Sequence, residues 1–242
     1  MFHVKRQGIA IGSKCDDIGE IVANELEESF PYLGLPDSTK RALPKIRKFA
    51  TLLALWGQTT NLTAHPTDPN EIIFHVMDSL APVALAIREP ASTLGRSLRK
   101  GRRLLDFGSG AGFPGLIIAT AVGIETVLLE SRRKRASFLA VAASTLGLKY
   151  VSVTQSFKEP NSDSDRFDIV TARAVGKHRE FFHLAAQALK PGGIAMLFLN
   201  IGQAVEADAG RAGLVELPAA VYDISRGDEK IRRVLGIWLK ES

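Results

Sequence analysis

The sequence has a single cysteine and no long apolar run, and each shortage excludes a class of protein. With only Cys15 in 242 residues, an internal disulfide framework and a zinc site built from clustered cysteines are both excluded. No stretch approaches the roughly 20 apolar residues that cross a bilayer, and Met1 to Cys15 lacks the apolar segment of a signal peptide. We therefore expect a cytoplasmic protein that needs neither a membrane nor a metal.

Length and composition are those of an ordinary globular protein. On a prior of roughly 100–200 residues per domain, 242 residues make one large domain, or one with a small appendage. The chain is 45% hydrophobic and 24% charged, and at this length folding buries about 70% of the extended surface. A substantial core therefore needs no disulfide to hold it.

Positive charge is unevenly distributed along the chain. The net charge is +5, but residues 1–30 contain three basic and six acidic side chains, so the rest carries +8. Much of it lies in three short groups: Arg96, Arg99, Lys100, Arg102 and Arg103; Arg132, Arg133, Lys134 and Arg135; and Arg226, Lys230, Arg232 and Arg233. Such groups suit a polyanion such as nucleic acid, although solvated faces of a basic protein would look the same.

Residues 1–95 form a predicted helical cap. Apolar residues recur at helical spacing from Ile18 to Leu26 and again from Phe49 to Trp56. Gly57 is a plausible end for the second helix, and a third apolar stretch, residues 72–87, is interrupted by Pro82.

Residues 96–242 read as an α/β domain. Short apolar runs alternate with amphipathic segments, which is typical of a mostly parallel sheet with helices on both faces. We predict strands at 103–107, 126–130, 150–154, 168–171 and 194–199, and helices near 114–121, 134–146 and 180–189. The Lys190 to Gly193 turn leads into the fifth strand. Two later runs, 221–224 and 234–240, are joined by a charged loop and predict an antiparallel edge.

A glycine-rich turn follows the first predicted strand. Asp106-Phe107 leads into Gly108-Ser109-Gly110-Ala111-Gly112-Phe113-Pro114, and a following helix would accept Pro114 in its first turn. Glycines there permit positive φ and close approach of a ligand. In an open α/β sheet, such a loop lies at the carboxyl edge, where ligands bind.

Spacing distinguishes between two ligands for this loop. A dinucleotide fingerprint needs G-x-G-x-x-G, and its third glycine would fall on Phe113. Glu130 ends the next strand 20 residues after Gly110, where a carboxylate can accept both hydroxyls of a ribose, and Asp106 would place negative charge near a cationic cofactor. S-adenosylmethionine (SAM) has a ribose, an ammonium and a sulfonium but no phosphate, so the pattern favours SAM.

Longer motifs resemble one methyltransferase family. They are Trp56-(x)4-Asn61-Leu62-Thr63-Ala64, His75-(x)2-Asp78-Ser79-Leu80, the glycine loop ending in Phe113-Pro114-Gly115, Leu129-Glu130-Ser131, Thr171-Ala172-Arg173-Ala174, and Lys190-Pro191-Gly192-Gly193. Together they span roughly residues 47–200. The chain resembles the small-subunit rRNA guanine-N7 methyltransferases, first called glucose-inhibited division protein B.

The resemblance implies a Rossmann-like, class I SAM-dependent methyltransferase sheet behind an N-terminal helical segment. It also implies methyl transfer to N7 of a guanine in the decoding-region loop of small-subunit rRNA. We expect a monomer that acts on the rRNA or on an assembling small subunit. The resemblance assigns to the cofactor Gly108, Phe113, Glu130, Lys158, Glu159 and Arg173. The loop pattern adds Asp106, Gly110 and Gly112 to the predicted cofactor residues. Arg173 is also the predicted catalytic residue, because it matches an arginine that the family keeps beside the cofactor and target.

The sequence departs from the family pattern at three places. Phe157 stands where an arginine is usual, and Asn200-Ile201-Gly202 replaces L-K-G after the fifth strand. The Arg232 to Leu235 segment lacks the histidine of the family's R-H-L ending. The first 40 or so residues have no recognisable counterpart. These departures put the adenine-side contacts and one cationic contact in doubt.

Methylation at N7 requires alignment rather than proton transfer. Guanine N7 carries a lone pair and no proton, so the enzyme has only to hold the reactants in line. Such alignment can lower the activation barrier by roughly 7–11 kcal/mol. We therefore expect His75, Asp78 and Arg173 to position groups, and His75 could equally be a hydrogen-bonded packing residue. No essential general acid or base is predicted.

The basic groups around Arg132 and Arg99 are the predicted RNA-binding residues. If Ser131 caps the helix after Glu130, four cations lie near its positive end, where each is disfavoured by a few tenths of a kcal/mol. A polyanion would reverse that sign. We expect both groups to form part of an rRNA-binding rim beside the cofactor mouth: Arg132, Arg133, Lys134 and Arg135, with Arg99, Lys100, Arg102 and Arg103. Snorkelling surface side chains are the alternative.

Two other functions stay open. One is a SAM enzyme of the same fold with a different substrate, or a nucleotide-linked oxidoreductase. The other is a SAM-binding, RNA-binding protein with lost or altered activity.

Overall fold

The computed structural model describes residues 3–174, 176, 178–205 and 208–241. The helices are α1 (His3–Leu33), η1 (Asp37–Ala42), α2 (Leu43–Gly57), α3 (Pro69–Arg88), α4 (Thr93–Ser97), α5 (Gly115–Val122), α6 (Arg133–Thr145), η2 (Asp163–Asp165), α7 (His178–Ala188) and α8 (Asp208–Arg211). The strands are β1 (Arg103–Phe107), β2 (Glu125–Leu129), β3 (Val151–Thr154), β4 (Phe167–Arg173), β5 (Leu189–Asn200), β6 (Leu214–Arg226) and β7 (Glu229–Lys240).

One seven-stranded sheet organises the described chain, in the order β3-β2-β1-β4-β5-β7-β6. The first five strands are parallel, and β7 is antiparallel to both β5 and β6. This confirms the predicted fold class, a mostly parallel sheet with an antiparallel edge. Because parallel strands end at the same edge, the loops after β1, β2, β4 and β5 lie together.

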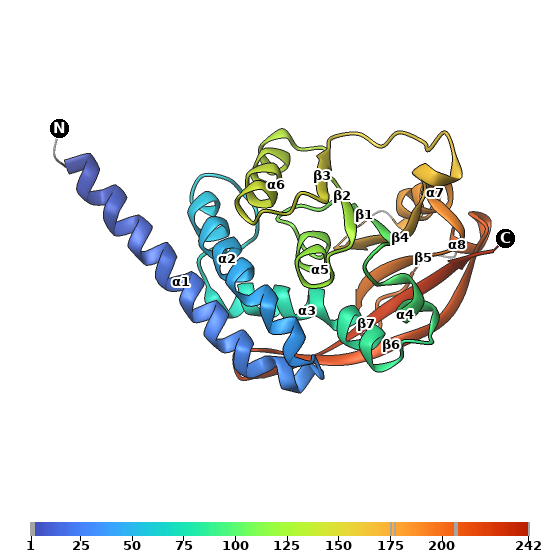
Figure 1. Ribbon diagram of the computed structural model, residues 1–242, viewed down its shortest axis with the longest axis horizontal. Coiled ribbons are helices and arrows are strands. Elements are labelled where there is room, and N and C mark those ends of the chain that lie inside the picture. Colours follow the sequence, from blue (N-terminus) through green and yellow to red (C-terminus); the bar gives the residue numbers. More distant parts are fainter. Residues whose placement is uncertain (1–2, 175, 177, 206–207, 242) are drawn as a thin grey trace.

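Successive side chains along each strand point to opposite faces of the sheet, and they fill one core on each face. Leu104, Ile169 and Met196 join the core under α2, α3, α5 and α6, whereas their neighbours Leu105, Val170 and Leu197 join the core under α7. Figure 1 shows α1 packed along α2 and extending away from the body toward the N-terminus. The first core runs without a break from Cys15 on α1 to Ile237 on β7. The division near residue 95 stays a prediction.

The C-terminal hairpin differs from its prediction. The pairing is much longer than expected, and the turn is confined to Gly227 and Asp228. The charged residues predicted as a loop are paired across the strands, since both Lys230 and Arg232 contact Asp223. Cross-strand ion pairs of this kind let a charged sequence form a solvated edge.

Helix α3 is long and rich in apolar residues. It is 20 residues long with a mean hydropathy of 1.3, so by length and composition it could cross a membrane. The expectation concerned an unbroken apolar run, and Glu71 and Asp78 interrupt the apolar residues of this helix. Because 67% of the span is buried inside the molecule, its apolar residues are those of a core helix.

Phe49 links α2 to the glycine loop. Its buried ring makes an edge contact with Phe113, with centroids 5.3 Å apart, and lies 6.2 Å from the ring of Phe138 on α6. This contact fixes the base of the loop against the helical segment.

We expect Phe49→Ala to lower the free energy of unfolding by about 3–5 kcal/mol, because it removes a fully buried ring. Leu55→Ala, on the exposed side of the same helix, should change it by no more than about 0.5 kcal/mol. Urea unfolding measures both. Equal effects of the two substitutions would contradict the packing described.

Candidate functional site

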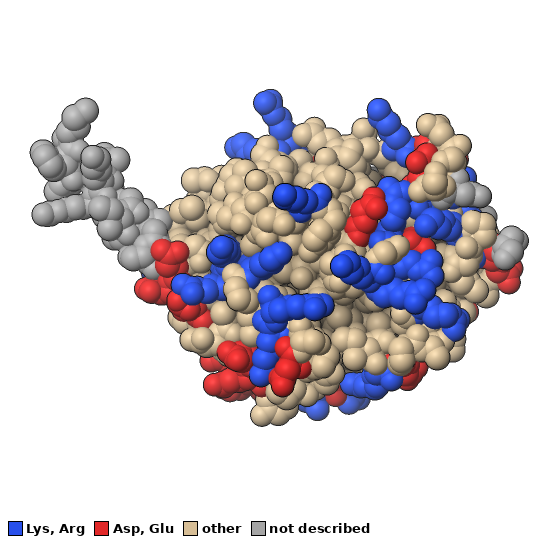
Figure 2. All heavy atoms as spheres, viewed as in Figure 1, with Lys and Arg blue, Asp and Glu red and all other residues tan. Residues whose placement is uncertain are grey.

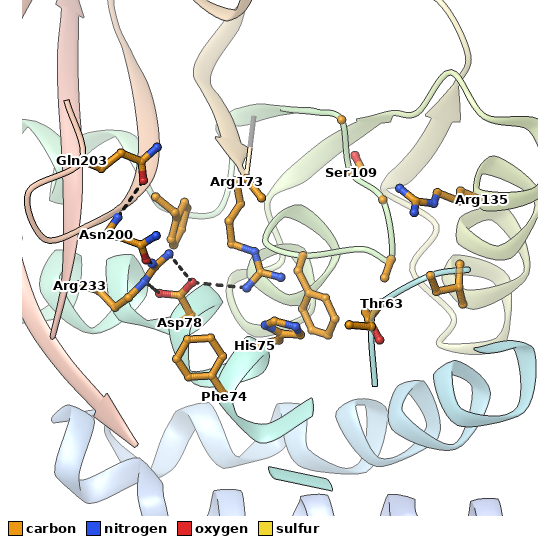
Figure 3. Close-up of a pocket in the computed structure, with 18 residues that line it drawn as sticks. Thr63, Phe74, His75, Asp78, Ser109, Arg135, Arg173, Asn200, Gln203 and Arg233 are labelled. Atoms are coloured by element: carbon orange, nitrogen blue, oxygen red, sulfur yellow. Dashed lines mark hydrogen bonds and ion pairs between the residues drawn. The ribbon is translucent and has the colours of Figure 1, made fainter. Parts of the chain in front are cut away.

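A cavity of about 380 Å³ opens at the carboxyl edge of the sheet. The loops after β1, β4 and β5 line it, together with α3, β7, the loop after α2 and one residue of α6. Figure 3 shows Ser109 and Arg135 on one side, Asn200, Gln203 and Arg233 on the other, and Asp78, His75 and Arg173 between them. Its size is that of a small-molecule pocket.

The glycine loop, residues 108–112, forms one wall of the cavity. The amides of Gly108 and Ser109 both donate to the carbonyl of Leu129, which ties the loop to β2. Gly108, Gly110 and Gly112 all have positive φ. At Gly108 a β-carbon would meet no atom within 4 Å and would project into open space. The prediction that these three glycines adopt positive φ is therefore confirmed.

Glu130 braces the loop from behind. Its carboxylate accepts from the amides of Gly110 (3.0 Å) and Arg132 (2.7 Å), and the residue is only 5% exposed. The prediction that Ser131 caps α6 is wrong: the N-cap is Arg132, whose amide is bound by Glu130. Pro114 likewise lies at the N-cap of α5, just before the helix begins, rather than in the first turn.

Asp106 lies beneath the loop instead of facing the cavity. The carboxyl is fully buried, its Oδ2 accepts from the amide of Gly115 (3.1 Å), and its Oδ1 has no hydrogen-bond partner. A β-carbon at Gly115 would lie 2.5 Å from the Asp106 side chain, so only glycine fits there. Burial raises the pKa of Asp106 to about 7.

Asp78 joins four elements at the centre of the site. Its Oδ1 accepts from Tyr222 Oη (2.6 Å) and Arg233 Nε (3.2 Å), and its Oδ2 from Arg233 Nη2 (3.3 Å) and Arg173 Nη1 (3.4 Å). We call these four residues the Asp78 cluster. Burial and the neighbouring carboxylate raise the pKa of Tyr222, so its hydroxyl stays a donor. Two guanidinium groups on one carboxylate leave the cavity positively charged.

Arg173 and His75 occupy the middle of the cavity. Arg173, at the end of β4, lies over the Phe113 ring at 5.0 Å. His75 packs 5.1 Å from the same ring, and its buried Nδ1 has no hydrogen-bond partner. Burial, together with Arg173, Arg226 and Arg233, lowers the pKa of His75 to about 3. The imidazole is therefore neutral at physiological pH and is not a proton-donating cation.

Some predicted cofactor residues lie outside this cavity. Lys158 and Glu159 are exposed in the loop after β3, and neither lines the cavity. Phe157, the departure beside them, packs against the core under α7. Gly112 is covered by Leu116 rather than open to the cavity. Sequence reasoning missed Tyr222 and the buried role of Arg233, because each meets Asp78 from a strand more than 140 residues away.

The two predicted RNA-binding groups lie at opposite edges of the sheet. The α6 group, Arg132 to Arg135, borders the cavity through Arg135, which donates to the carbonyl of Asn61. The β1 group, Arg99, Lys100, Arg102 and Arg103, lies at the amino end of β1. Arg102 is bonded to Asp168, and Arg103 to Glu125. The expectation that the β1 group lies beside the cavity is therefore wrong.

Basic side chains also gather over α4, on the face drawn in Figure 2. A hollow there is lined by Arg96, Arg102 and Lys190 around the buried carboxylate of Asp168. Within the described residues, no group of three or more histidines, cysteines or carboxylates could hold a metal ion.

Comparison with known proteins identifies the family. The sequence model of the family described as rRNA small subunit methyltransferase G matches residues 42–212, well over half of the chain. The chain belongs to this family. A ribosomal RNA small subunit methyltransferase G from Nitrosococcus oceani is 37% identical over 179 residues, which cover 74% of this chain and 76% of the relative. One from Stenotrophomonas maltophilia is 32% identical, covering 74% and 78%.

The fold of this family member also resembles solved methyltransferase structures. A protein provisionally assigned as a sarcosine dimethylglycine methyltransferase, from Galdieria sulphuraria, superposes with a TM-score of 0.52. It shares 15% identity, and the match covers 72% of this chain and 87% of the other. Similarity at this level concerns the fold alone.

The buried carboxyl of Asp106 predicts a pH dependence of stability in this methyltransferase-family chain. Between about pH 4 and pH 7 the folded state binds more protons at Asp106 than the unfolded state does, because the folded pKa is raised from 3.8 to about 7. The free energy of unfolding of the wild type, relative to that of Asp106→Asn, should therefore fall as pH rises through this window, by up to about 1.4 kcal/mol per pH unit. It should level off above pH 7.

Urea unfolding of both proteins at pH 5, 6, 7 and 8 measures this difference. Asparagine keeps an oxygen for the amide of Gly115, so the comparison isolates the titration. A difference that stays constant over the series would show that Asp106 does not titrate there.

Proposed function

We propose that the chain is a SAM-dependent methyltransferase that methylates N7 of a guanine in the decoding-region loop of small-subunit rRNA. The observation that carries the proposal is family membership over residues 42–212, which span the glycine loop, Glu130, Asp78 and Arg173. The proposal also takes the cytoplasm as the site of action and a monomer as the working form.

The glycine loop fits a methyl donor of this kind. Gly108, Ser109 and Gly110 present backbone to the cavity, and Gly108 leaves open space where a side chain would stand. Glu130 uses both carboxylate oxygens on backbone amides, yet each oxygen can accept a second hydrogen bond. We infer that these residues hold the cofactor, with Glu130 toward the ribose, and that Lys158 and Glu159 border the adenine.

The chemistry needs no general base. SAM, when bound, supplies an electrophilic methyl on a sulfonium, and guanine N7 supplies a lone pair without a proton to remove. The chain's side chains agree with this requirement: His75 is neutral, and Asp78 is saturated with donors. Arg173 is held by Asp78 and by the Phe113 ring. We assign to Arg173 the task of positioning both reactants.

Incubation with methyl-labelled SAM and unmethylated small ribosomal subunits tests the proposal. We expect label in one rRNA guanine, as N7-methylguanine. Gly108→Ala should lose methylation and bind S-adenosylhomocysteine at least about tenfold more weakly, because alanine is strained at φ +73° and its β-carbon enters the cavity.

Gly123→Ala is the matched control. Gly123 has a φ of +75° and equally open surroundings, but it lies at the opposite end of α5. It should therefore carry a similar backbone cost and retain methylation and cofactor affinity. If the wild type binds S-adenosylhomocysteine but leaves rRNA unlabelled, the chain is a SAM-binding protein without this activity.

The α6 group is the proposed rRNA contact. Arg132, Arg133 and Lys134 are exposed at the N-terminus of α6, where the first turn has no acidic residue. A polyanion beside the cavity would relieve the repulsion between these cations and the helix dipole.

We expect Arg132→Glu with Arg133→Glu to weaken rRNA binding and to flatten its salt dependence by about 1–2 in the log–log slope. Filter binding over a salt series measures the slope. The same reversal at Arg99 and Lys100, on the opposite edge, should have the smaller effect. An unchanged slope in the α6 variant would remove this surface from the proposal.

A further inference from the structure

The side-chain oxygens of three residues at one end of the cavity accept hydrogen bonds from within the protein. This β5–β7 end is formed by Asn200, Gln203 and Arg233, above Asp78 (Figure 3). Asp78 accepts four hydrogen bonds, from Tyr222, Arg173 and twice from Arg233. A carboxylate has about four acceptor positions, so Asp78 has none left for a ligand.

The amide oxygens of Asn200 and Gln203 each accept one hydrogen bond from within the protein. Asn200 Oδ1 accepts from Arg233 Nη1, and Gln203 Oε1 accepts from the backbone amide of Asn200 at 3.1 Å. These contacts fix the orientation of both amides, because a guanidinium and a backbone N–H can only donate. Each side chain therefore has its NH2 group available as a donor.

The β5–β7 end thus presents the NH2 groups of Asn200 and Gln203 as donors, because their oxygens are turned toward Arg233 and the Asn200 backbone amide and because Asp78 has no acceptor position left. The edge of guanine that carries N7 presents two acceptors, N7 and O6, whereas the same edge of adenine presents N7 and a donating N6 amino group. An amino group placed against these donors would lose its water partners and gain none. The donor pattern therefore matches guanine and opposes adenine.

The position of these donors also fits the target base. Glu130 and the glycine loop follow β2 and β1, so a cofactor held there occupies one side of the cavity. Asn200 and Gln203 follow β5 on the opposite side, with Arg173 at the end of β4 between the two. Both residues are exposed and accessible from solution.

We propose that Asn200 and Gln203 are specificity-determining residues that donate to O6 of the target guanine and so discriminate it from adenine. The proposal rests on the proposed function. Arg233 and the Asp78 cluster act as positioning residues in it, because they hold the Asn200 amide with its NH2 group free.

Asn200→Asp and Gln203→Glu test the proposal with little change in shape. Each acid keeps the oxygen that accepts the internal hydrogen bond and replaces the donating NH2 with a second acceptor. We expect each to lower kcat/KM for unmethylated small subunits by about 10–100-fold, on the scale of one lost base contact. The dissociation constant for S-adenosylhomocysteine and the melting temperature should stay unchanged.

Asn24→Asp is the charge-matched control, because Asn24 is exposed on α1 and does not line the cavity. A second measurement compares the affinity of the protein, loaded with S-adenosylhomocysteine, for subunits carrying guanine or adenine at the mapped position. The wild type should prefer guanine at least fivefold, and Asn200→Asp should bind the two about equally.

Three results would overturn the proposal while leaving the proposed function intact. The first is an unchanged kcat/KM in both acidic variants. The second is a parallel loss of S-adenosylhomocysteine affinity, which would place these residues on the cofactor. The third is equal wild-type affinity for guanine and adenine subunits, which would mean that the donors meet a phosphate or sugar. If the wild type fails to methylate subunits at all, the proposed function falls and this inference falls with it.

Discussion

The buried carboxylate of Asp78 is the interaction on which the site depends. It ties α3 to β4, β6 and β7 through two arginines and a tyrosine. Removing one partner from a buried ion pair leaves an uncompensated charge, which costs far more than breaking a surface pair. The positions of Arg173 and Arg233, and through Arg233 the orientation of Asn200, are therefore consequences of one side chain.

The regular part of the fold could be predicted because its signals are local. Apolar runs such as Leu104-Leu105 and the glycines after them specify a strand and a ligand-binding turn within a dozen residues. The ends of the strands in the edge hairpin could not be predicted from local signals. Lys230 and Arg232 fit a strand because they form ion pairs with Asp223, and these pairs exist only when the two strands are paired. Charge alone had favoured a loop.

The candidate site was predicted in part. Gly108, Gly110, Phe113 and Arg173 lie in the cavity wall as their motifs imply, and Glu130 lies directly behind Gly110. Asp106 was placed correctly at the end of β1, but its burial beneath the loop depends on the absence of a β-carbon at Gly115. Arg233 reads in sequence as one of several surface cations. Its burial follows from a partner 155 residues away, which no local pattern encodes.

The strand order has a consequence for how the site forms during synthesis. β7 lies between β5 and β6 in the sheet although it follows both in sequence. A nascent chain that has just completed β6 has no strand through which to attach it to β5, and it lacks Arg233. The glycine-loop wall needs only β1 and β2, which are synthesised much earlier, so the two walls of the cavity are completed at different times and the β5–β7 end is completed second.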